Sequence, residues 1–331
     1  MAPAVFSVTA LSMAVNLMRP ATTSVLDKVF SRKKGQLTDQ FSWDIKFSSE
    51  RLMKNIRVSD EATVSDGIGR KNVSCKAPRF ADKRFIAAAD LNAMRAFGSQ
   101  VETQLLTERV GDEQYDMRQK IDLTREFMAV KALGGQVVDE AGTVLVDYNF
   151  PAEQLPVLAG AALWTDADSD PVKNLRAWKK QIKQGAGLIT GFYAFCGSGA
   201  MDALLNNPKA LELMKYLAGK QIAEEGRISY LAGVEIEEYI GSYIDADGDR
   251  QDFIGDDEFI MIGVGPDIAA ELYAPVIDLK APTGVGKGKA ANLFFSKMWE
   301  VEDPSGQWVK VESRPLPVII RPQAIIKATV I

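Results

Sequence analysis

Residues 55–80 form a long segment that could bury very little apolar surface by itself. Its branched aliphatic side chains are Ile56, Val58, Val64, Ile68 and Val73. Charged residues separate them, and the alternating pattern with glycine turns indicates strand, turn and strand. A lone two-stranded ribbon is marginally stable in water. The segment is therefore either a flexible surface loop or a ribbon held by another body, commonly another subunit.

Composition indicates a soluble globular chain with little catalytic potential. Hydrophobic residues make up 47% and charged residues 25% of 331 residues, which suffices for a folded core. The chain has no histidine, which excludes a Ser-His-Asp triad, a Cys-His pair and a His-ligated zinc. The two cysteines, Cys75 and Cys196, are too few for a thiolate metal cage. We therefore predict no catalytic residue, no cofactor and no metal.

Charge and hydropathy limit the possible partners. Lys and Arg number 39 and Asp and Glu number 44, so the net charge is −5 and tight non-specific binding of nucleic acid is disfavoured. Residues 1–17 are uncharged and resemble the apolar part of a signal peptide, but no Lys or Arg precedes them. An exported binding protein stays an alternative. No stretch is apolar enough to predict a spanning helix or a membrane partner.

The clearest predicted helix covers residues 112–133. Met117, Ile121 and Met128 recur on it at helical spacing, and glycines at 134 and 135 end it. The other faces are predicted to carry charged side chains, namely Asp116, Arg118, Lys120, Asp122 and Arg125. With a single apolar stripe, this helix is expected to pack as a strut against a sheet. A hairpin is predicted directly after it, over residues 136–148.

The rest of the chain predicts mixed α+β structure with discontinuous domains. Residues 1–35 show no sustained period and are expected to form an extended arm ending in basic residues. An acidic turn at 164–170 precedes a helix that begins at Pro171 and suggests a domain boundary. Residues 187–217 have the order strand then helix, and the last 60 residues carry strand-like runs separated by prolines.

Two short motifs suggest ligand sites, and both have a simpler explanation. Residues Gly284–Lys289 resemble a phosphate loop, which leaves a nucleotide-binding enzyme as an alternative, but the glycine spacing is wrong and Ala290 follows the last lysine. Asp245 and Asp247 begin an alternation of carboxylates like that of a calcium loop, but Gly248 stands at the fourth position instead of the sixth. We predict a solvated loop and a hairpin turn, respectively.

The order of these elements, with three short sequence motifs, resembles the lambda-like phage major capsid protein E family. The first motif runs from Arg125 to Gly135 in the long helix. The second comprises Tyr239–Tyr243 and Phe253–Gly263 on either side of the Asp-Gly turn, and the third is Ser313–Pro322 before a terminal strand. The match covers most of the chain from about residue 40 onward.

This resemblance implies the Hong Kong 97-type capsid fold. It places an N-terminal arm at 1–40, an extended β-ribbon loop at 41–85, and a peripheral domain with the spine helix at 86–163. It places an axial domain at 164–290 and a return to the peripheral sheet at 291–331. The spine-helix residues are then Met117, Ile121 and Met128, and the turn of the axial-domain hairpin comprises Asp245, Asp247 and Gly248.

The resemblance also implies a function and partners. It implies a major head protein that forms hexamers and pentamers of an icosahedral shell around double-stranded DNA, held without sequence specificity. Portal, scaffolding and decoration proteins are the expected partners, with assembly in the bacterial cytoplasm and a final location in the virion capsid. The loop would lie across an adjacent subunit, and its expected contact residues are Arg57, Val58, Val64, Ile68, Arg70, Lys71, Val73, Lys76 and Arg79.

Overall fold

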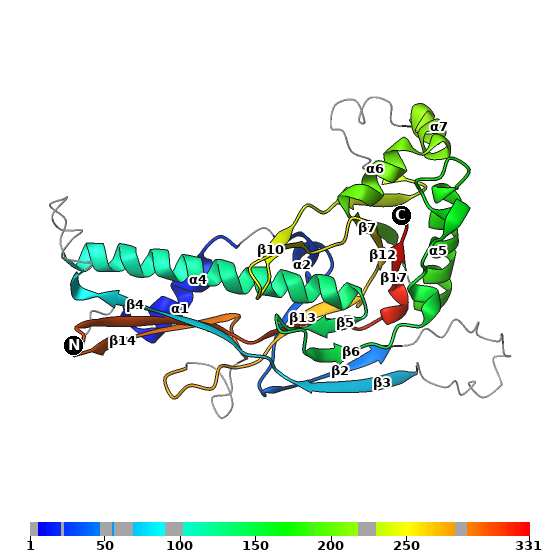
Figure 1. Ribbon diagram of the computed structural model, residues 1–331. Coiled ribbons are helices and arrows are strands. Elements are labelled where there is room, and N and C mark those ends of the chain that lie inside the picture. The colour runs from blue at the N-terminus through cyan, green and yellow to red at the C-terminus, as the bar shows by residue number, and fades with distance from the viewer. Residues whose placement is uncertain are drawn as a thin grey trace. The chain divides into compact units, whose positions relative to one another are not determined.

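The computed structural model describes residues 6–20, 23–46, 55, 69–89, 102–187, 189–217, 230–281 and 290–331 (Figure 1). The chain divides into two compact units. Unit 1 comprises Met1–Ser42, Ser74–Ala129 and Ala270–Val318. Unit 2 comprises Trp43–Val73, Val130–Ala269 and Ile319–Ile331. Each unit is discontinuous in sequence, and one boundary falls within the long helix α4 (Glu102–Leu133).

Unit 1 is built on an antiparallel sheet of β14 (Phe294–Val301), β15 (Gly306–Ser313) and β4 (Phe80–Ala87). The central strand β15 pairs along its whole length with both neighbours. One buried cluster joins this sheet to α1 (Val8–Leu17) and α4 through Leu11, Val15, Met117, Ile121, Phe294, Val309 and Val311. The predicted packing of the long helix against a sheet is therefore confirmed.

A second, smaller sheet in unit 1 contains three short strands. They are β1 (Lys33–Gly35), β13 (Ala269–Tyr273) and β16 (Pro315–Ile319), in the order β1, β13, β16. Strands β1 and β13 are parallel, and Lys33 lies opposite Glu271. This sheet brings Glu271 into the interior of the unit, where its side chain is fully buried.

The N-terminal region is helical, so the predicted extended arm was wrong in this respect. Helix α1 begins after Ser7, whose side-chain oxygen accepts a hydrogen bond from the amide of Ala10, and a short helix α2 covers Ser24–Lys28. Leu11 and Val15 are four residues apart and both are buried. A single pair of apolar residues at helical spacing is too weak a signal to predict a helix from the sequence. Packing of this pair in the core of unit 1 stabilises the helix.

Helix α4 differs from the prediction at its start and on its polar faces. It begins at Glu102 instead of residue 112, because the buried Val110 continues the stripe of Met117 and Gly111 is tolerated within the helix. Two predicted surface arginines and one aspartate are also buried: Arg118 is 5% exposed, Asp122 0% and Arg125 3%. These charges are accommodated because they pair with one another and with Glu271.

Unit 2 contains a five-stranded sheet in the order β17, β12, β7, β9, β8. Its strands are β7 (Gly191–Cys196), β8 (Tyr230–Leu231), β9 (Val234–Glu238), β12 (Glu258–Val264) and β17 (Ile325–Thr329). Strands β7 and β9 are parallel, and the segment between them contains α6 (Ser198–Asn206) and α7 (Pro208–Leu217). Strand β7 starts at Gly191, a little later than the apolar run from residue 188 suggests.

Helix α5 (Pro171–Ala186) packs its apolar face against this sheet. Asp170 caps the helix by accepting a hydrogen bond from the amide of Lys173. Trp178 of the helix lies in one aromatic group with Trp164 and Phe259, whose ring centroids are 5.0 to 6.1 Å apart. The predicted helix from Pro171 is thus present, and it closes the core of unit 2.

Three pairs of strands complete the fold. They are β2 (Gln40–Lys46) with β3 (Arg70–Lys76), β5 (Gln136–Val138) with β6 (Val144–Asp147), and β10 (Ser242–Ile244) with β11 (Arg250–Asp252). The second pair confirms the predicted hairpin after α4. Short 3-10 turns occur at Ala152–Gln154, Gly160–Ala162 and Pro322–Ala324. The α+β class is confirmed, and none of the described helices is long and apolar enough to cross a membrane.

Candidate functional site: assembly surfaces and the charge network of helix α4

The predicted extended loop is described only at its base, in β2 and β3. Phe41, Trp43 and Ile45 alternate along β2 and are buried, whereas β3 turns mostly exposed side chains outward. Of the expected contact residues, Arg70, Lys71 and Lys76 are exposed and Val73 is half-buried. The remaining expected residues of the loop, Arg57, Val58, Val64 and Ile68, lie outside the described residues.

Arg79, the last expected contact residue of the loop, has an ion pair within its own chain. Its guanidinium donates to both carboxylate oxygens of Glu312, at 2.9 and 3.0 Å. Burial alone would raise the pKa of Glu312, but hydrogen bonds from Arg79 and Lys310 outweigh burial and lower it. Arg79 therefore fixes the segment before β4 to β15 within unit 1.

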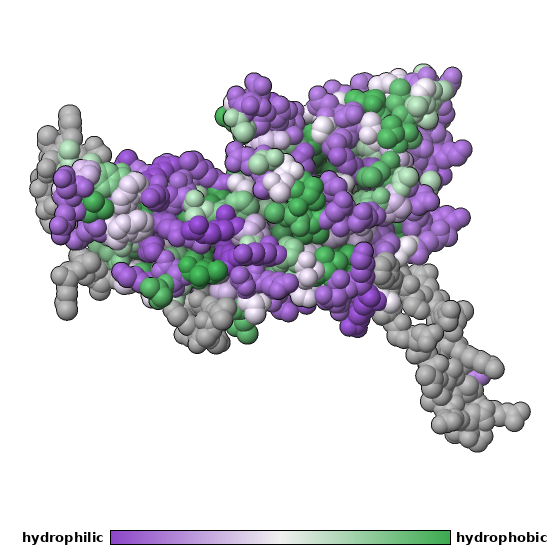
Figure 2. Space-filling model, turned by 60° about the horizontal axis from the view of Figure 1, so that its bottom comes forward, coloured by the Kyte–Doolittle hydropathy of each residue, from purple (hydrophilic) through white to green (hydrophobic). Residues whose placement is uncertain are grey.

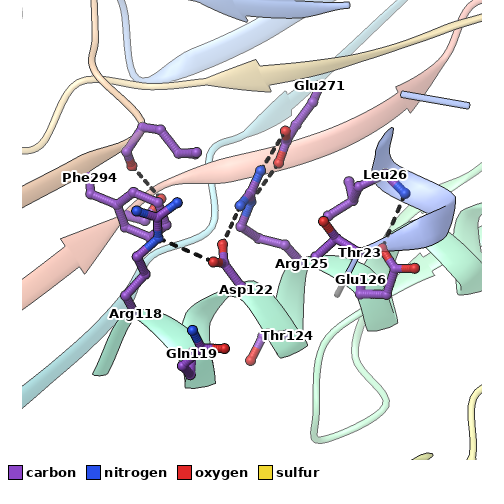
Figure 3. A network of polar contacts seen from close by, with 12 residues as sticks. Thr23, Leu26, Arg118, Gln119, Asp122, Thr124, Arg125, Glu126, Glu271 and Phe294 are labelled. Atoms are coloured by element: carbon purple, nitrogen blue, oxygen red, sulfur yellow. Dashed lines mark hydrogen bonds and ion pairs between the residues drawn. The ribbon is translucent and has the colours of Figure 1, made fainter. Parts of the chain in front are cut away.

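The most elaborate polar arrangement in unit 1 is a buried charge network on α4 (Figure 3). Arg125 donates to both oxygens of Glu271 at 2.7 Å and also bonds Asp122. Arg118 donates to the other oxygen of Asp122 at 3.3 Å. Burial would lower the pKa of Arg125, but the charges and hydrogen bonds of Glu271 and Asp122 raise it above its usual range.

This network also holds the N-terminal segment. Arg118 donates to the carbonyls of Val15 and Met18 at the end of α1. The carboxylate of Glu126 accepts the amides of Val25 and Leu26 at 2.8 and 3.1 Å, in the first turn of α2. An anion at a helix N-terminus accepts hydrogen bonds from the free amides and interacts favourably with the positive end of the helix dipole. Helix α4 therefore holds backbone groups of both short helices, in addition to the apolar contacts of α1.

Sequence reasoning placed Arg118, Asp122 and Arg125 on solvated faces and missed this network. Their spacing of four and three residues along α4 was a usable signal, since such residues are neighbours on a helix. Glu271 lies 146 positions away from Arg125, so no local pattern could have identified it. Arg125 and Glu126 do belong to the first motif of the family resemblance, and both have structural roles here.

The three predicted spine residues, Met117, Ile121 and Met128, are all buried. Met117 and Ile121 lie in the cluster beneath α1 and the β14–β15 sheet. Methionine side chains are flexible and fill irregular gaps, so they can pack beside the planar guanidinium groups on the same helix. The role of these residues as a spine within a shell remains a proposal.

The predicted turn of the axial-domain hairpin is a β-turn between β10 and β11. The carboxylate of Asp245 accepts the amides of Asp247 and Asp249 at 3.1 and 2.9 Å, and these hydrogen bonds lower its pKa. Gly248 has a φ of +92°, which favours glycine. The hairpin interpretation is thus confirmed, and within the described residues no group of three or more acidic or cysteine side chains is arranged to hold a metal.

Aromatic side chains close the base of this hairpin. Phe253 packs on Tyr239 at 5.9 Å and on Tyr243 at 5.2 Å between ring centroids. Gly241 lies between the rings, and a Cβ atom there would be 2.4 Å from a ring carbon of Tyr239. The second motif of the resemblance therefore encodes packing, and its glycine is required by close approach.

Apolar residues also reach the surface of the protein. Figure 2 shows hydrophobic side chains in separate groups among hydrophilic ones on one face. Large hydrophobic residues that are more than half exposed include Leu17, Val157, Ile240, Ile277 and Leu279. Apolar side chains that are scattered singly over a surface are normal in folded proteins, so these residues do not define a site by themselves. The two cysteines do not form a site: burial raises the pKa of Cys196 to about 12 and that of the half-buried Cys75 to about 11.

Solved structures share this fold. A protein of an Escherichia coli CFT073 prophage, described as a capsid protein, is 17% identical with a TM-score of 0.65, covering 98% of this chain and 99% of that one. A phage-related protein from Bordetella bronchiseptica RB50 is 15% identical with a TM-score of 0.59, covering 97% and 96%. A chain of the mature capsid of bacteriophage PhiM1 is 11% identical with a TM-score of 0.51, covering 90% of this chain and 83% of that one. The fold is thus the Hong Kong 97-type capsid fold.

The sequence gives the more specific assignment. A family model described as phage major capsid protein E matches residues 7–330, and no curated protein sequence is significantly similar. The chain belongs to the phage major capsid protein E family. Its function is that of a tailed-phage major capsid protein, located in the virion capsid and associating with copies of itself. The predicted resemblance is confirmed, and the family's role is structural.

Proposed function

We propose that this chain assembles into hexamers and pentamers of an icosahedral shell that encloses double-stranded DNA, and that it catalyses no reaction. The family match over residues 7–330 is the observation that carries this proposal. In this arrangement residues 1–40 form the arm and 41–85 the loop. Residues 86–163 with 291–324 form the peripheral domain, and 164–290 form the axial domain at the centre of each capsomer. The terminal strand β17, predicted with the peripheral sheet, is assigned to the axial domain instead, because it pairs with β12 in the five-stranded sheet.

The extended loop would provide the link between neighbouring subunits. Residues 55–80 have few apolar side chains of their own, and an adjacent subunit would cover them. Burial contributes about 25 cal/mol per Å² of apolar surface, whereas an exposed ion pair contributes less than about 1 kcal/mol. The valines and isoleucines should therefore matter more than Arg70 and Lys71. Because every subunit repeats the contact, a modest energy for each one suffices for a stable shell.

The net charge supports a shell that encloses DNA without binding it tightly. A shell of subunits with a net charge of −5 releases few counterions from DNA and leaves it free to move during packaging. Portal, scaffolding and decoration proteins would be the other partners, with assembly in the host bacterial cytoplasm. No cofactor takes part in this function.

Deletion of residues 57–68 tests the role of the loop. The deletion ends before β3 because Ala77 and Arg79 bond Arg314 and Glu312 within unit 1. We expect a folded, soluble subunit that forms no closed particles when it is co-expressed with its neighbouring head genes, as judged by negative-stain microscopy. Intact particles from the deletion variant would refute the role of the loop.

A pair of substitution variants separates the two kinds of contact. Replacing Val58, Val64 and Ile68 together by serine should abolish particles as the deletion does, because apolar burial is lost. Replacing Arg70 and Lys71 by glutamine should leave most particles intact, because only exposed charges are lost. The reverse pattern would show that ion pairs hold the loop. Absence of particles from the wild-type chain would contradict the proposed function itself.

A further inference from the structure

The exposed side of helix α5 carries positive charge only. The polar face of this helix presents Lys173, Arg176, Lys179, Lys180 and Lys183, and the helix contains no Asp or Glu. Its apolar face is buried in the core of unit 2. A solvated helix of an acidic protein usually mixes both signs, since pairs of opposite charge stabilise it. A helix face of one sign therefore points to an interaction with something outside the helix.

The positive charges of α5 have no acidic partner in the described part of the chain, where no ion pair includes any of the five. Lys179 donates instead to the carbonyl of Ala232 at 2.7 Å and lies over the ring of Phe192. Burial lowers the pKa of Lys179, and the charges of Lys183 and Arg176 lower it further. Like charges thus crowd one another along this face.

The same unit contains a surface of the opposite sign. The hairpin of β10 and β11 carries four carboxylates and one positive side chain, Arg250. The carboxylates are Asp245, Asp247, Asp249 and Asp252. The carboxylate of Asp245 accepts hydrogen bonds from the amides of the turn. The other three carboxylates are exposed and form no ion pair in the described residues. Ile244, 61% exposed, adds an apolar side chain beside them.

The two surfaces lie on opposite sides of unit 2. In Figure 1 the green helix α5 borders this unit on the right, and the yellow hairpin with β10 borders it on the left. Lys173, Arg176 and Lys180 are three and four residues apart, so they share one helix face over about 10 Å. Asp249 directly precedes β11 and Asp252 ends it, so these two carboxylates are about 10 Å apart along the extended chain and point to opposite faces of the hairpin.

We propose that the basic face of α5 in one subunit docks on the acidic β10–β11 hairpin of the next subunit in the capsomer. This inference rests on the proposed function. A ring of identical subunits needs a heterologous interface, in which two different surfaces of one chain meet. Opposite charges on opposite sides of one unit meet that requirement. They also oppose wrong pairings, since α5 would repel α5 and hairpin would repel hairpin.

A polyanion such as packaged DNA is the other class of partner for a basic helix. The second copy is favoured because this chain itself supplies an acidic surface. In addition, the remainder of the subunit is acidic: removing the five positive charges of α5 from a net charge of −5 leaves −10. Such a subunit would approach DNA against long-range repulsion.

A charge-swap experiment tests the docking. The first variant changes Lys173, Arg176 and Lys180 to glutamate, and the second changes Asp247, Asp249 and Asp252 to lysine. Lys179 and Asp245 stay, because they bond backbone groups within the unit. The third variant combines both sets. A control replaces Lys173 and Lys180 by arginine, and circular dichroism melting checks that each dissociated subunit is folded.

Particles are counted by sedimentation and microscopy after co-expression with the head genes. We expect each reversed variant to yield less than about one tenth of the wild-type particles, and the combined variant to recover at least half of them. The arginine control should match the wild type. Normal assembly of both reversed variants would overturn the docking while leaving the proposed function intact.

Loss of assembly in the first variant without recovery in the combined variant would also overturn the proposal. If that result came together with DNA binding by the wild-type subunit that weakens steeply with salt, the basic face would be assigned to DNA. Failure of the wild-type chain to form particles would instead contradict the proposed function on which the inference rests.

Discussion

Replacing Arg125 by methionine should strongly destabilise unit 1. The change keeps much of the side-chain length but removes two hydrogen bonds of 2.7 Å to Glu271 and one bond to Asp122. Glu271 is fully buried, so its carboxylate would lose its partner without gaining water. Breaking a buried ion pair from one side costs about 3–5 kcal/mol. We expect the free energy of unfolding to fall by that amount.

The assay is urea unfolding of the dissociated subunit, followed by circular dichroism and analysed by linear extrapolation. Arg109→Met on the same helix is the matched control. Arg109 is 43% exposed, and its partner Glu113 also pairs with Arg84, so the control should lose less than about 1 kcal/mol. A double variant with Glu271→Met should recover part of the loss. A loss of under about 1 kcal/mol for Arg125→Met would refute the network's importance.

Two further predictions concern single sites. Because hydrogen bonds from Arg79 and Lys310 hold the pKa of Glu312 below its usual value near ~4.3, its stabilisation is present above that value and lost as pH falls. Glu312→Gln should therefore cost most above pH about 5, and the difference from wild type in urea unfolding should shrink below pH about 4; a constant difference would contradict this. Gly241→Ala should lower the free energy of unfolding by about 1–3 kcal/mol, because the new methyl group meets the buried rings of Tyr239 and Phe253. Gly111→Ala should raise it by up to about 1 kcal/mol, because alanine favours the helix and a Cβ atom there meets no atom within 4 Å. Thermal melting of the two variants should show opposite shifts in Tm, and equal shifts would refute the packing argument.

Elements with strong local signals could be predicted from the sequence. The stripe of Met117, Ile121 and Met128 identified the long helix, and the Asp-Gly turn at residue 248 identified the β10–β11 hairpin. Pro171 after an acidic turn marked the start of α5. In each case the local propensity and the final structure agree, so nearby residues alone decide the element.

Features that depend on distant residues could not be predicted. The start of α4 at Glu102 depends on burial of Val110 against the β14–β15 sheet, and helix α1 is stabilised by the same cluster. Arg118 and Arg125 were predicted to be exposed because charged residues usually are. Their burial depends on Glu271 and on carbonyls of the N-terminal segment, which only the folded chain brings near.

Buried and exposed charges contribute differently to the specificity of this chain. A buried charge network contributes little net stability compared with an apolar core, but it accepts only one arrangement of donors and acceptors. In unit 1 it holds the backbone of α1 and α2 at defined positions on α4, in addition to the apolar contacts that Leu11 and Val15 make in the core. Exposed charges, as on α5, impose no such order within the subunit. Their single sign contributes to specificity only when a second copy supplies the opposite one, which makes the charge-swap variants a direct test of whether the capsomer is encoded on the subunit surface.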